Sequence, residues 1–474
     1  MKRLVVVGGG IAGLATAYTA QKLAREQGAD VAIALVERDD RLGGKVSTDL
    51  TDGFVIEGGP DSFITQKPWA LQLCREVGLE DRLIGTNDAQ RTNFVLRKGK
   101  LRKMPDGLMM IVPTRLMPFV TSDLISWPGK LRMGMDLFLP RRTDDGDESL
   151  AHFIRRRLGN EALEVLAEPL MGGIHVADAE ILSLQATFPR FIDTERKYGS
   201  LTRGMIAARK LAQAHEAAFK ANGHPKMSMF TTLRGGLREL VDAIAVALDG
   251  VEVLTGCAVA ALDCDGDGYT LRLDDGRALA ADAVVLAAPA YASADLLRGV
   301  QPELADMLDA VKYVSTATVS LGFDADGFEH PLDGFGFVIP RQEPTRLLAC
   351  TWTSTKFPQR AAPGTVLLRA FIGGPRREDL VDLDDEALVR LVRDELRAIM
   401  GIHAEPTVAR VFRWHRANPQ YEVGHLERVD QMDALCPPGV LLAGSAYRGV
   451  GLPDCIHQGQ QAARAALGYL GIGE

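Results

Sequence analysis

A glycine-rich turn near the amino terminus constrains the fold most strongly. Gly8, Gly10 and Gly13 have the G-x-G-x-x-G spacing and directly follow the apolar run at residues 4–7. In this pattern the first glycine permits a tight turn from strand to helix, the second leaves space for a pyrophosphate, and the third lets the helix pack closely against the strand. The free N–H groups at the start of the helix favour the phosphate charge. The pattern therefore predicts a dinucleotide-binding βαβ unit.

An acidic residue occupies the position that this unit requires. A second apolar run at residues 31–36 ends at Glu37, whose carboxylate can accept hydrogen bonds from ribose hydroxyls. An ordinary glycine-rich turn in a parallel sheet is the alternative. The order of strand, glycines, helix, second strand and acid favours the dinucleotide.

Composition narrows the remaining classes of protein. The 474 residues predict about two to three domains, and 46% hydrophobic with 24% charged residues is typical of a globular protein in water. A net charge of −8 argues against nucleic acid as the main partner. The six cysteines lack C-x-x-C spacing, so we expect neither a metal site nor a disulfide framework. The chain has no uninterrupted run of about eighteen apolar residues, so we expect no transmembrane helix and a cytoplasmic location.

Two segments far downstream resemble further strands of the same sheet. Residues 282–289 are an apolar run that ends in proline, and residues 439–445 are a short apolar run that ends in glycine and serine. Helical periodicity follows from 454 to 470. We therefore expect one nucleotide-binding domain assembled from three separate pieces, at residues 1–89, 201–310 and 416–474.

Two inserts separate these pieces. Residues 90–200 contain several X-Pro pairs and helical patterns, which predict a mostly helical subdomain. Residues 311–415 contain β-rich runs interrupted by an amphipathic helix at 384–400, which predict a sheet that covers the cofactor and binds the substrate. Within the first insert, residues 108–139 combine apolar side chains and Trp127 with basic flanks. Peripheral membrane contact and packing inside the subdomain are the two interpretations of that segment.

The stretch after Glu37 indicates which dinucleotide to expect. A second glycine pair lies beside basic residues at 41–45, and Gly-Gly-Pro-Asp follows at 58–61. This continuation resembles flavoproteins of the amine-oxidase and phytoene-desaturase group rather than nicotinamide dehydrogenases. The resemblance implies FAD, with residues 41–45 along the diphosphate and residues 59–62 near the flavin ring.

Motifs along almost the whole chain resemble one family more closely, the oxygen-dependent porphyrinogen oxidases of haem synthesis, and in particular their soluble Gram-positive type. The motifs are EGGPDSF at 57–63, EPLMGGI at 168–174, SLQATFP at 183–189, ACTW at 349–352, RWHRANPQY at 413–421 and GVGLPDCI at 449–456. The resemblance implies an α/β fold in which a Rossmann-like split FAD-binding domain carries a β-rich substrate domain and a mostly helical insert, as in amine oxidases and p-hydroxybenzoate hydroxylase.

The resemblance also implies a reaction. Members of this family use FAD and dioxygen to remove six electrons from coproporphyrinogen III, and they release coproporphyrin III and hydrogen peroxide. Protoporphyrinogen IX, which gives protoporphyrin IX, is the alternative substrate. The flavin carries the chemistry, so we expect no catalytic side chain. A transient contact with a ferrochelatase is implied as well, and both a monomer and a homodimer fit the sequence.

The family's cofactor contacts transfer to this chain by matching motif. The glycine turn is assigned to the pyrophosphate, Glu37 and Arg38 to the adenosine ribose, and Val259 to adenine through its backbone. Lys45 is assigned to the diphosphate side, and Trp414 flanks the isoalloxazine. The full set is Gly8, Gly9, Gly10, Ile11, Ala12, Gly13, Glu37, Arg38, Lys45, Gly59, Pro60, Asp61, Ser62, Val259, Trp414, Val450, Gly451 and Leu452.

Substrate binding requires a large apolar slot with cationic ends, because the macrocycle is flat and its propionates are anionic. The resemblance assigns Lys67 to a propionate, the backbone of Gly173 to the pyrrole N–H groups, and Phe371 and Val338 to the faces of the ring. Solvation of Lys67 and ordinary core packing of the apolar residues are the alternatives. Further candidates for the propionates are Arg91, Arg97, Lys98 and Arg190.

Three other functions compete with this one. An amine oxidase shares the flavin scaffold, and many amine oxidases attach FAD to a cysteine at the place where Cys455 stands. The Pro-Asp-Cys-Ile context belongs instead to porphyrinogen oxidases, so we expect FAD without a covalent bond. A carotenoid desaturase and a non-catalytic porphyrin-delivery scaffold are the remaining alternatives. His175 is either a nearby base or, as we expect, a hydrogen-bonded histidine of the cavity wall; the same two interpretations apply to His415, and we assign catalysis to neither.

Overall fold

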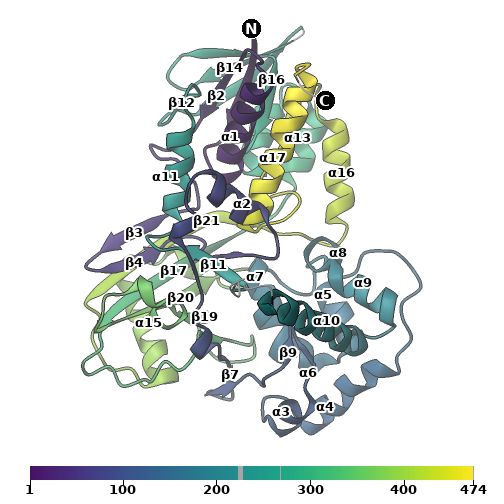
Figure 1. The fold of residues 1–474 in the computed structure, drawn as a ribbon, viewed down its shortest axis with the longest axis vertical. Coiled ribbons are helices and arrows are strands. Elements are labelled where there is room, and N and C mark those ends of the chain that lie inside the picture. The colour runs from purple at the N-terminus through teal and green to yellow at the C-terminus, as the bar shows by residue number, and fades with distance from the viewer. Residues whose placement is uncertain (222–227, 267, 473–474) are drawn as a thin grey trace.

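A parallel sheet forms the core of the nucleotide-binding unit, which lies at the top of Figure 1. The computed structural model describes residues 1–221, 228–266 and 268–472. All strand pairs of this sheet are parallel, and both downstream segments predicted as strands lie in it. In order across the sheet, the strands are β12 (Glu252–Leu254), β2 (Val31–Val36), β1 (Lys2–Val7), β16 (Ala283–Leu286) and β22 (Val440–Leu442).

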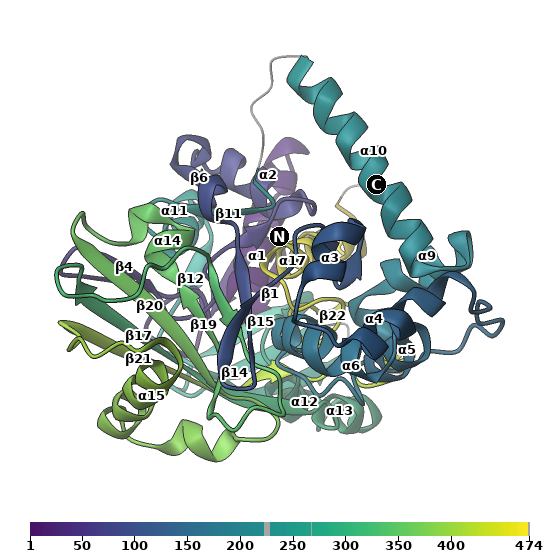
Figure 2. The ribbon, with the colours of Figure 1, turned by 90° about the horizontal axis from the view of Figure 1, so that it is seen from below.

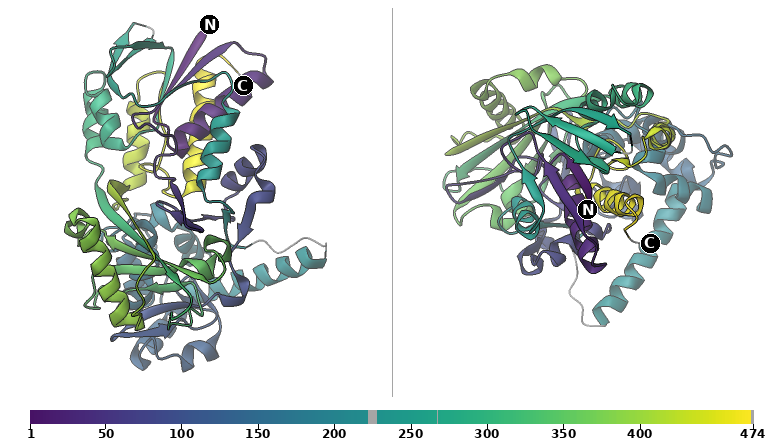
Figure 3. Two further views of the ribbon diagram at one scale, coloured as in Figure 1. Left: turned by 90° about the vertical axis from the view of Figure 1, so that its left-hand side faces the viewer. Right: turned by 90° about the horizontal axis from the view of Figure 1, so that it is seen from above.

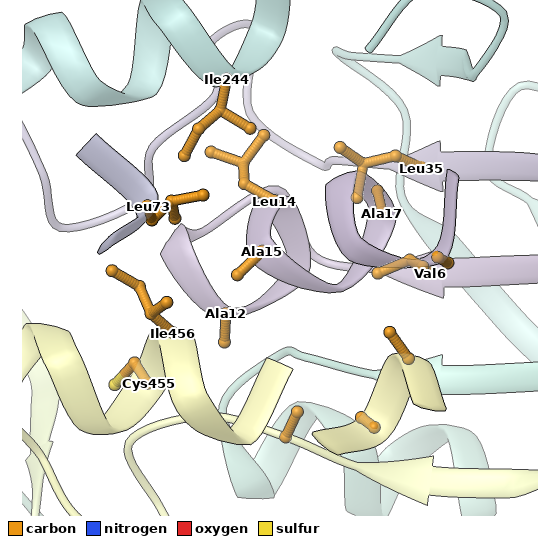
Figure 4. Packing of buried hydrophobic residues seen from close by; sticks show 14 of the residues in the cluster. Val6, Ala12, Leu14, Ala15, Ala17, Leu35, Leu73, Ile244, Cys455 and Ile456 are labelled. Carbon is orange, nitrogen blue, oxygen red and sulfur yellow. The ribbon is translucent and has the colours of Figure 1, made fainter. Parts of the chain in front are cut away.

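Two helices from opposite ends of the chain pack on this sheet. Helix α1 (Ile11–Glu26) follows the glycine turn, and α17 (Leu452–Tyr469) follows β22. Figure 4 shows Ala12 of α1 pointing towards the part of α17 that carries Cys455 and Ile456. A Cβ atom on Gly459 of α17 would lie 2.3 Å from the carbonyl oxygen of Ala12. Small residues on both helices therefore permit the close approach that brings the start of α17 beside the glycine turn.

A seven-stranded sheet forms the second unit, and helix α15 (Asp385–Met400) covers one of its faces. Alternating aliphatic side chains such as Val319 and Leu321 pack against Leu388 and Leu391 of α15, as the amphipathic pattern predicts. The opposite face is left for the cavity described below. The strands in order are β21 (Val408–Pro419), β17 (Tyr313–Asp324), β20 (Thr365–Gly373), β19 (Leu347–Trp352), β18 (Gly336–Val338), β7 (Asn93–Arg97) and β8 (Lys100–Lys103).

The start of the predicted helical insert differs from the expectation. Residues 93–103 form the β7–β8 hairpin, which extends the seven-stranded sheet rather than the helical subdomain. Lys98 and Gly99 both have positive φ at its turn, the conformation that tight hairpins require. Phe94 and Leu96 pack into the sheet core, whereas Val95 packs into the helical core. The hairpin therefore contributes to two cores at once.

Helices make up most of the remaining insert, and α10 (Leu201–Ala221) projects from the body of the protein (Figure 2 and Figure 3). Helix α10 packs against α9 of the insert, although residues 201–310 were expected to belong to the nucleotide-binding domain. Among the described helices, none is long and apolar enough to cross a membrane. The larger helices of the insert are α3 (Leu116–Thr121), α4 (Trp127–Gly134), α5 (Leu150–Arg157), the π-helix η4 (Leu163–Gly172) and α9 (Pro189–Tyr198).

Candidate functional site

A cavity of about 1340 Å³ lies between the nucleotide-binding unit, the seven-stranded sheet and the helical insert. Its lining runs from Gly8 and Gly10 past Lys45 and Gly59 to Phe371 of the sheet. Pockets for one small ligand usually occupy about 300–1,000 Å³. The cavity is therefore large enough to hold two molecules side by side.

The glycine turn forms one end of this cavity. Gly8 has a φ of +104°, and a Cβ atom there would lie 2.9 Å from the carbonyl oxygen of Ala287. A Cβ atom on Gly10 would meet no atom within 4 Å, because this residue borders open space at the start of α1. The Glu37 carboxylate accepts hydrogen bonds from the N–H groups of Gly9, at 2.6 Å, and Asp39, at 2.8 Å. These contacts hold the acid at the end of β2, beside the turn.

Lys45 supplies a positive charge farther along the cavity wall. Its ammonium group donates to the carbonyl oxygen of Ala417 and to the hydroxyl of Ser445, at 3.4 Å. None of the described carboxylates lies within ion-pair distance of it. The surrounding protein, by removing water, lowers the pKa of Lys45. A cation without a counter-charge in a cavity wall is suited to hold an anionic group.

The segment after β4 (Phe54–Glu57) is fixed in the middle of the wall. Gly58 accepts a hydrogen bond from the indole N–H of Trp414, at 2.8 Å. Arg369 donates to the carbonyl oxygens of Gly58, at 3.0 Å, and Gly59, at 2.7 Å. A Cβ atom on Gly59 would lie 1.8 Å from the carbonyl oxygen of Lys45. Glycine at this position therefore lets two wall segments touch.

Buried charges stand behind this segment. Arg360 pairs with Glu57 at 2.9 Å, and Lys356 pairs with Asp61 at 2.8 Å. Arg369 is the third cation of the cluster and the member that reaches the cavity wall. Burial raises the pKa of Glu57, whereas Lys356 and Arg369 overcome the effect of burial and hold the pKa of Asp61 well below its usual range. With three cations and two carboxylates, the cluster has an excess positive charge beside the cavity.

A cross-strand row of the seven-stranded sheet forms the wall at the other end. Val338 pairs with Ala349, Ala349 with Phe371, and Phe371 with Thr318 in the sheet register. Paired residues of neighbouring strands lie on the same face, and all four residues line the cavity. Gly173, which follows η4, also lines the cavity, and a Cβ atom there would meet no atom within 4 Å. The predicted substrate residues Val338, Phe371 and Gly173 therefore border one space.

Comparison with known proteins relates this geometry to a family. The profile of the family described as "Flavin containing amine oxidoreductase" matches residues 11–467. The coproporphyrinogen III oxidase of Bacillus subtilis (strain 168) is 40% identical over 99% of this chain and 98% of its own. The corresponding enzyme of Propionibacterium freudenreichii subsp. freudenreichii is 42% identical over 97% and 90%.

A solved structure and a plant enzyme are also similar to this chain over almost its whole length. A crystal structure from Exiguobacterium sp. 255-15, described provisionally as a protoporphyrinogen oxidase, has 35% identity, a TM-score of 0.86 and covers 98% of both chains. The chloroplastic protoporphyrinogen oxidase of Nicotiana tabacum is 31% identical over 98% of this chain and 85% of its own. The chain belongs to the porphyrinogen oxidase family of flavin oxidoreductases. Putrescine oxidase, at 17% identity and a TM-score of 0.69, shares the fold.

The cofactor of this flavin oxidoreductase is FAD, and the cavity fits such a dinucleotide. The glycine turn leaves open space at Gly10, Glu37 offers a carboxylate, and Lys45 offers a cation with no acidic partner among the described residues. Most of the predicted FAD residues line the cavity. They are Gly8, Gly10, Ile11, Ala12, Glu37, Arg38, Lys45, Gly59, Pro60, Val259, Trp414, Val450 and Leu452.

The other predicted cofactor residues lie behind the lining. Gly13 is buried against the turn, where a Cβ atom would lie 1.9 Å from the carbonyl oxygen of Gly8. Asp61 pairs with Lys356, and the Ser62 hydroxyl donates to Asp61 at 2.6 Å. Gly9 and Gly451 also lie outside the lining. In this structure these residues shape or support the wall rather than border the open space.

Lys67 lies outside the cavity lining, whereas His175 and His415 belong to it. The Lys67 ammonium donates to both carboxylate oxygens of Asp454, at 2.6 and 2.7 Å, and Lys67 is not among the lining residues. His175 and His415 both lie in the wall, and the buried Nδ1 of His175 has no hydrogen-bond partner among the described residues, unlike the hydrogen-bonded histidine expected. Burial lowers the pKa of His175 to about 4, so its imidazole is neutral at neutral pH. The Asp454 contact differs from the predicted role of Lys67 as a direct propionate ligand.

Several cations of the cavity were not identified from sequence. The four earlier candidates do not line it, and Arg91, Arg97 and Arg190 contact Asp88, Glu161 and Gln66 instead. Arginines that follow β18 and β20 line it, as does Arg369 on β20. No local motif marks these residues, because strand pairing across the sheet brings them to the cavity. They are Arg341, Arg346, Arg369, Arg376 and Arg377.

Proposed function

We propose that this protein oxidises coproporphyrinogen III to coproporphyrin III, with FAD as the electron acceptor and dioxygen as the final oxidant. The observation that carries the proposal is the joint cavity, in which an FAD-type cradle opens directly onto an apolar row with arginines at its edge. The names of the bacterial relatives give the same substrate for those proteins. Protoporphyrinogen IX is the alternative substrate, as the plant relatives' names indicate.

Bound FAD supplies two-electron oxidation, so three rounds account for the loss of six electrons and yield hydrogen peroxide from dioxygen. The protein's own contribution is to hold the macrocycle against the cofactor and to exclude competing reactions. In this proposal Phe371 and Val338 offer apolar contact to the ring, and the Gly173 carbonyl, which accepts from the Val176 N–H at 3.4 Å, also accepts from the pyrrole N–H groups. Lys67 is available to a propionate after it leaves Asp454.

Non-covalent attachment of FAD agrees with the chemistry of Cys455. Its thiol lies in the cavity lining and is buried, and burial raises the pKa of Cys455 to about 12. A protonated thiol is a poor nucleophile, so Cys455 is not activated to form a covalent bond with a flavin. Acid precipitation of the purified protein should therefore release its flavin into the supernatant. A yellow pellet would contradict this assignment.

Anaerobic mixing tests the proposed reaction directly. Coproporphyrinogen III should bleach the flavin absorbance of the holoenzyme, and admission of air should restore it while porphyrin fluorescence rises. Putrescine serves as the control, because an amine oxidase would be bleached by the amine instead. An unchanged flavin spectrum with coproporphyrinogen III and protoporphyrinogen IX would overturn the proposal and favour a porphyrin-delivery scaffold.

The segment at 108–139 is proposed to touch a membrane surface. Part of it packs inward, since Ile111, Phe119 and Leu124 are buried in the helical core. Other apolar side chains of the segment point outward, with basic residues beside them. The exposed fractions are 71% for Leu116, 72% for Met117, 63% for Trp127, 72% for Leu131 and 85% for Phe138.

Vesicle binding tests this contact. The protein should cosediment with vesicles that contain anionic lipid, and replacing Leu131 and Phe138 with glutamate should abolish binding without loss of flavin. Equal sedimentation with and without vesicles would contradict it. A contact with a ferrochelatase and the choice between monomer and homodimer stay predictions.

A further inference from the structure

Two arginines at the substrate end of the cavity converge on one carboxylate. Arg341 Nη1 lies 3.1 Å and Arg376 Nη2 lies 3.4 Å from Glu168 Oε1. Two neighbouring lining arginines are held elsewhere, because Arg346 donates to Glu395 at 3.0 Å and Arg377 to Asp379 at 3.1 Å. Neither of those acids lines the cavity. The Arg341–Arg376 pair is therefore distinguished from its neighbours by a partner in the cavity wall.

Sheet topology explains why these two arginines meet. Strands β18 and β20 are each antiparallel to β19, so they run parallel to each other. The carboxyl ends of parallel strands lie at the same edge of a sheet. Arg341 follows the end of β18, which carries Val338, and Arg376 follows the end of β20, which carries Phe371. The arginine pair therefore lies at the edge beyond the apolar row.

The pair retains hydrogen-bond donors for a second anion. A guanidinium group has five N–H donors in a planar fork and can bind a carboxylate through two of them. Each arginine donates one hydrogen bond to Glu168, Arg376 Nη2 also lies 3.6 Å from Asp178 Oδ2, and the two arginine side chains are 43% and 41% exposed. Glu168 comes from η4 and is 15% exposed. Glu168, with Asp178 beside Arg376, therefore holds the two guanidinium groups at the wall, and each group keeps N–H donors that make no hydrogen bond to the described residues.

We propose that Arg341 and Arg376 form a carboxylate site that makes the enzyme prefer the porphyrinogen with more propionates. This inference rests on the proposed function. Coproporphyrinogen III has four propionates, whereas protoporphyrinogen IX has two and carries vinyl groups in place of the others. A ring with carboxylates on every side needs cations at more than one edge of the slot. Lys67 belongs to the edge near α17, and the arginine pair supplies the other edge, with Glu168 as its positioning residue.

Substitution of each arginine tests the site with both substrates. In Arg341→Gln and Arg376→Gln, the KM for coproporphyrinogen III should rise about tenfold, the effect of about 1.4 kcal/mol. The kcat should stay within about twofold, and the KM for protoporphyrinogen IX should change less than about twofold. Arg376→Lys should recover part of the loss, because it restores charge without the fork. Arg298→Gln and Arg390→Gln remove exposed arginines that pair with a carboxylate outside the cavity lining, so they are matched controls that should change neither KM.

Equilibrium binding separates this inference from the proposed function. Quenching of protein fluorescence by coproporphyrin III and by protoporphyrin IX measures affinity without turnover. The Kd for coproporphyrin III should rise about tenfold in the two variants and stay constant in the controls. Equal changes for both porphyrins, or unchanged affinity, would overturn the carboxylate site even in an active enzyme. Turnover of neither porphyrinogen by the wild-type holoenzyme, with the binding differences intact, would overturn the proposed function alone.

Discussion

Removing Arg360 should destabilise the protein far more than removing a surface arginine. The guanidinium of Arg360 and the carboxylate of Glu57 are 1% and 2% exposed and lie 2.9 Å apart. Glu57 also accepts hydrogen bonds from the Leu237 N–H at 2.8 Å and the Thr48 hydroxyl at 2.7 Å, so it cannot turn to water. Breaking such a buried pair costs about 3–5 kcal/mol. Arg360→Met should lose that amount, out of a total stability of about 5–15 kcal/mol.

Urea denaturation of the holoenzyme, followed by tryptophan fluorescence, measures this loss. Arg390→Met removes an exposed partner of Glu386 and should cost about 0–1 kcal/mol. Adding Glu57→Gln to Arg360→Met should recover stability, because the unpaired buried charge is then gone. Equal losses in Arg360→Met and Arg390→Met, or a further loss in the double variant, would show that the buried Glu57 charge does not depend on Arg360.

The stability of Arg360→Met should depend on pH in a direction that the pKa of Glu57 determines. Burial already raises the pKa of Glu57 above its ordinary value, and loss of Arg360 should raise it further. A carboxyl group whose pKa is higher in the folded state binds more protons when folded, so stability falls as the pH rises through that range. The difference between Arg360→Met and the wild type should therefore be smaller at pH 5 than at pH 8.

Three further variants test the cofactor end of the cavity. In Gly59→Ala the new Cβ atom would meet the Lys45 carbonyl, so the purified protein should contain less flavin, whereas Gly134→Ala in open space should retain it. Lys45→Met should raise the Kd for FAD about tenfold by removing one charge-assisted hydrogen bond, measured by titration of the apoprotein, and an unchanged Kd would contradict its role. Arg369→Met removes a buried cation and should therefore lower the flavin midpoint potential by about 30 mV, equivalent to about 1.4 kcal/mol. Arg369→Lys should restore the potential. Equal potentials in the wild type and both variants would contradict this role of Arg369.

Local patterns predicted much of the fold. The glycine turn, the two downstream strands and the amphipathic helix α15 each depend on residues close in sequence, and the structure contains all of them. The β7–β8 hairpin was missed because its tight turn has Lys98 before Gly99, and its apolar residues serve two cores. Residues 201–221 were assigned to the nucleotide-binding domain with no helix predicted there, whereas α10 packs against α9 of the insert.

Long-range pairing limited prediction of the site. Motif matching selected residues that mostly line one cavity, including Val338 and Phe371. The partner of Lys67 is Asp454, 387 positions away, and no spacing rule connects them. Arg341 and Arg376 reach the cavity only through the order of β18, β19 and β20. Arginines on these loops could therefore be assigned to the cavity only from the three-dimensional structure.

A crystal structure of the holoenzyme soaked with coproporphyrin III would show whether FAD and the porphyrin share this cavity. FAD should extend from the glycine turn to Gly59, and the porphyrin should lie between Gly173 and the row that contains Phe371. One propionate should lie within hydrogen-bond distance of Arg341 and Arg376. Density for the porphyrin outside this cavity, or FAD in the space beside Phe371, would show that the cavity does not hold the two molecules in this order.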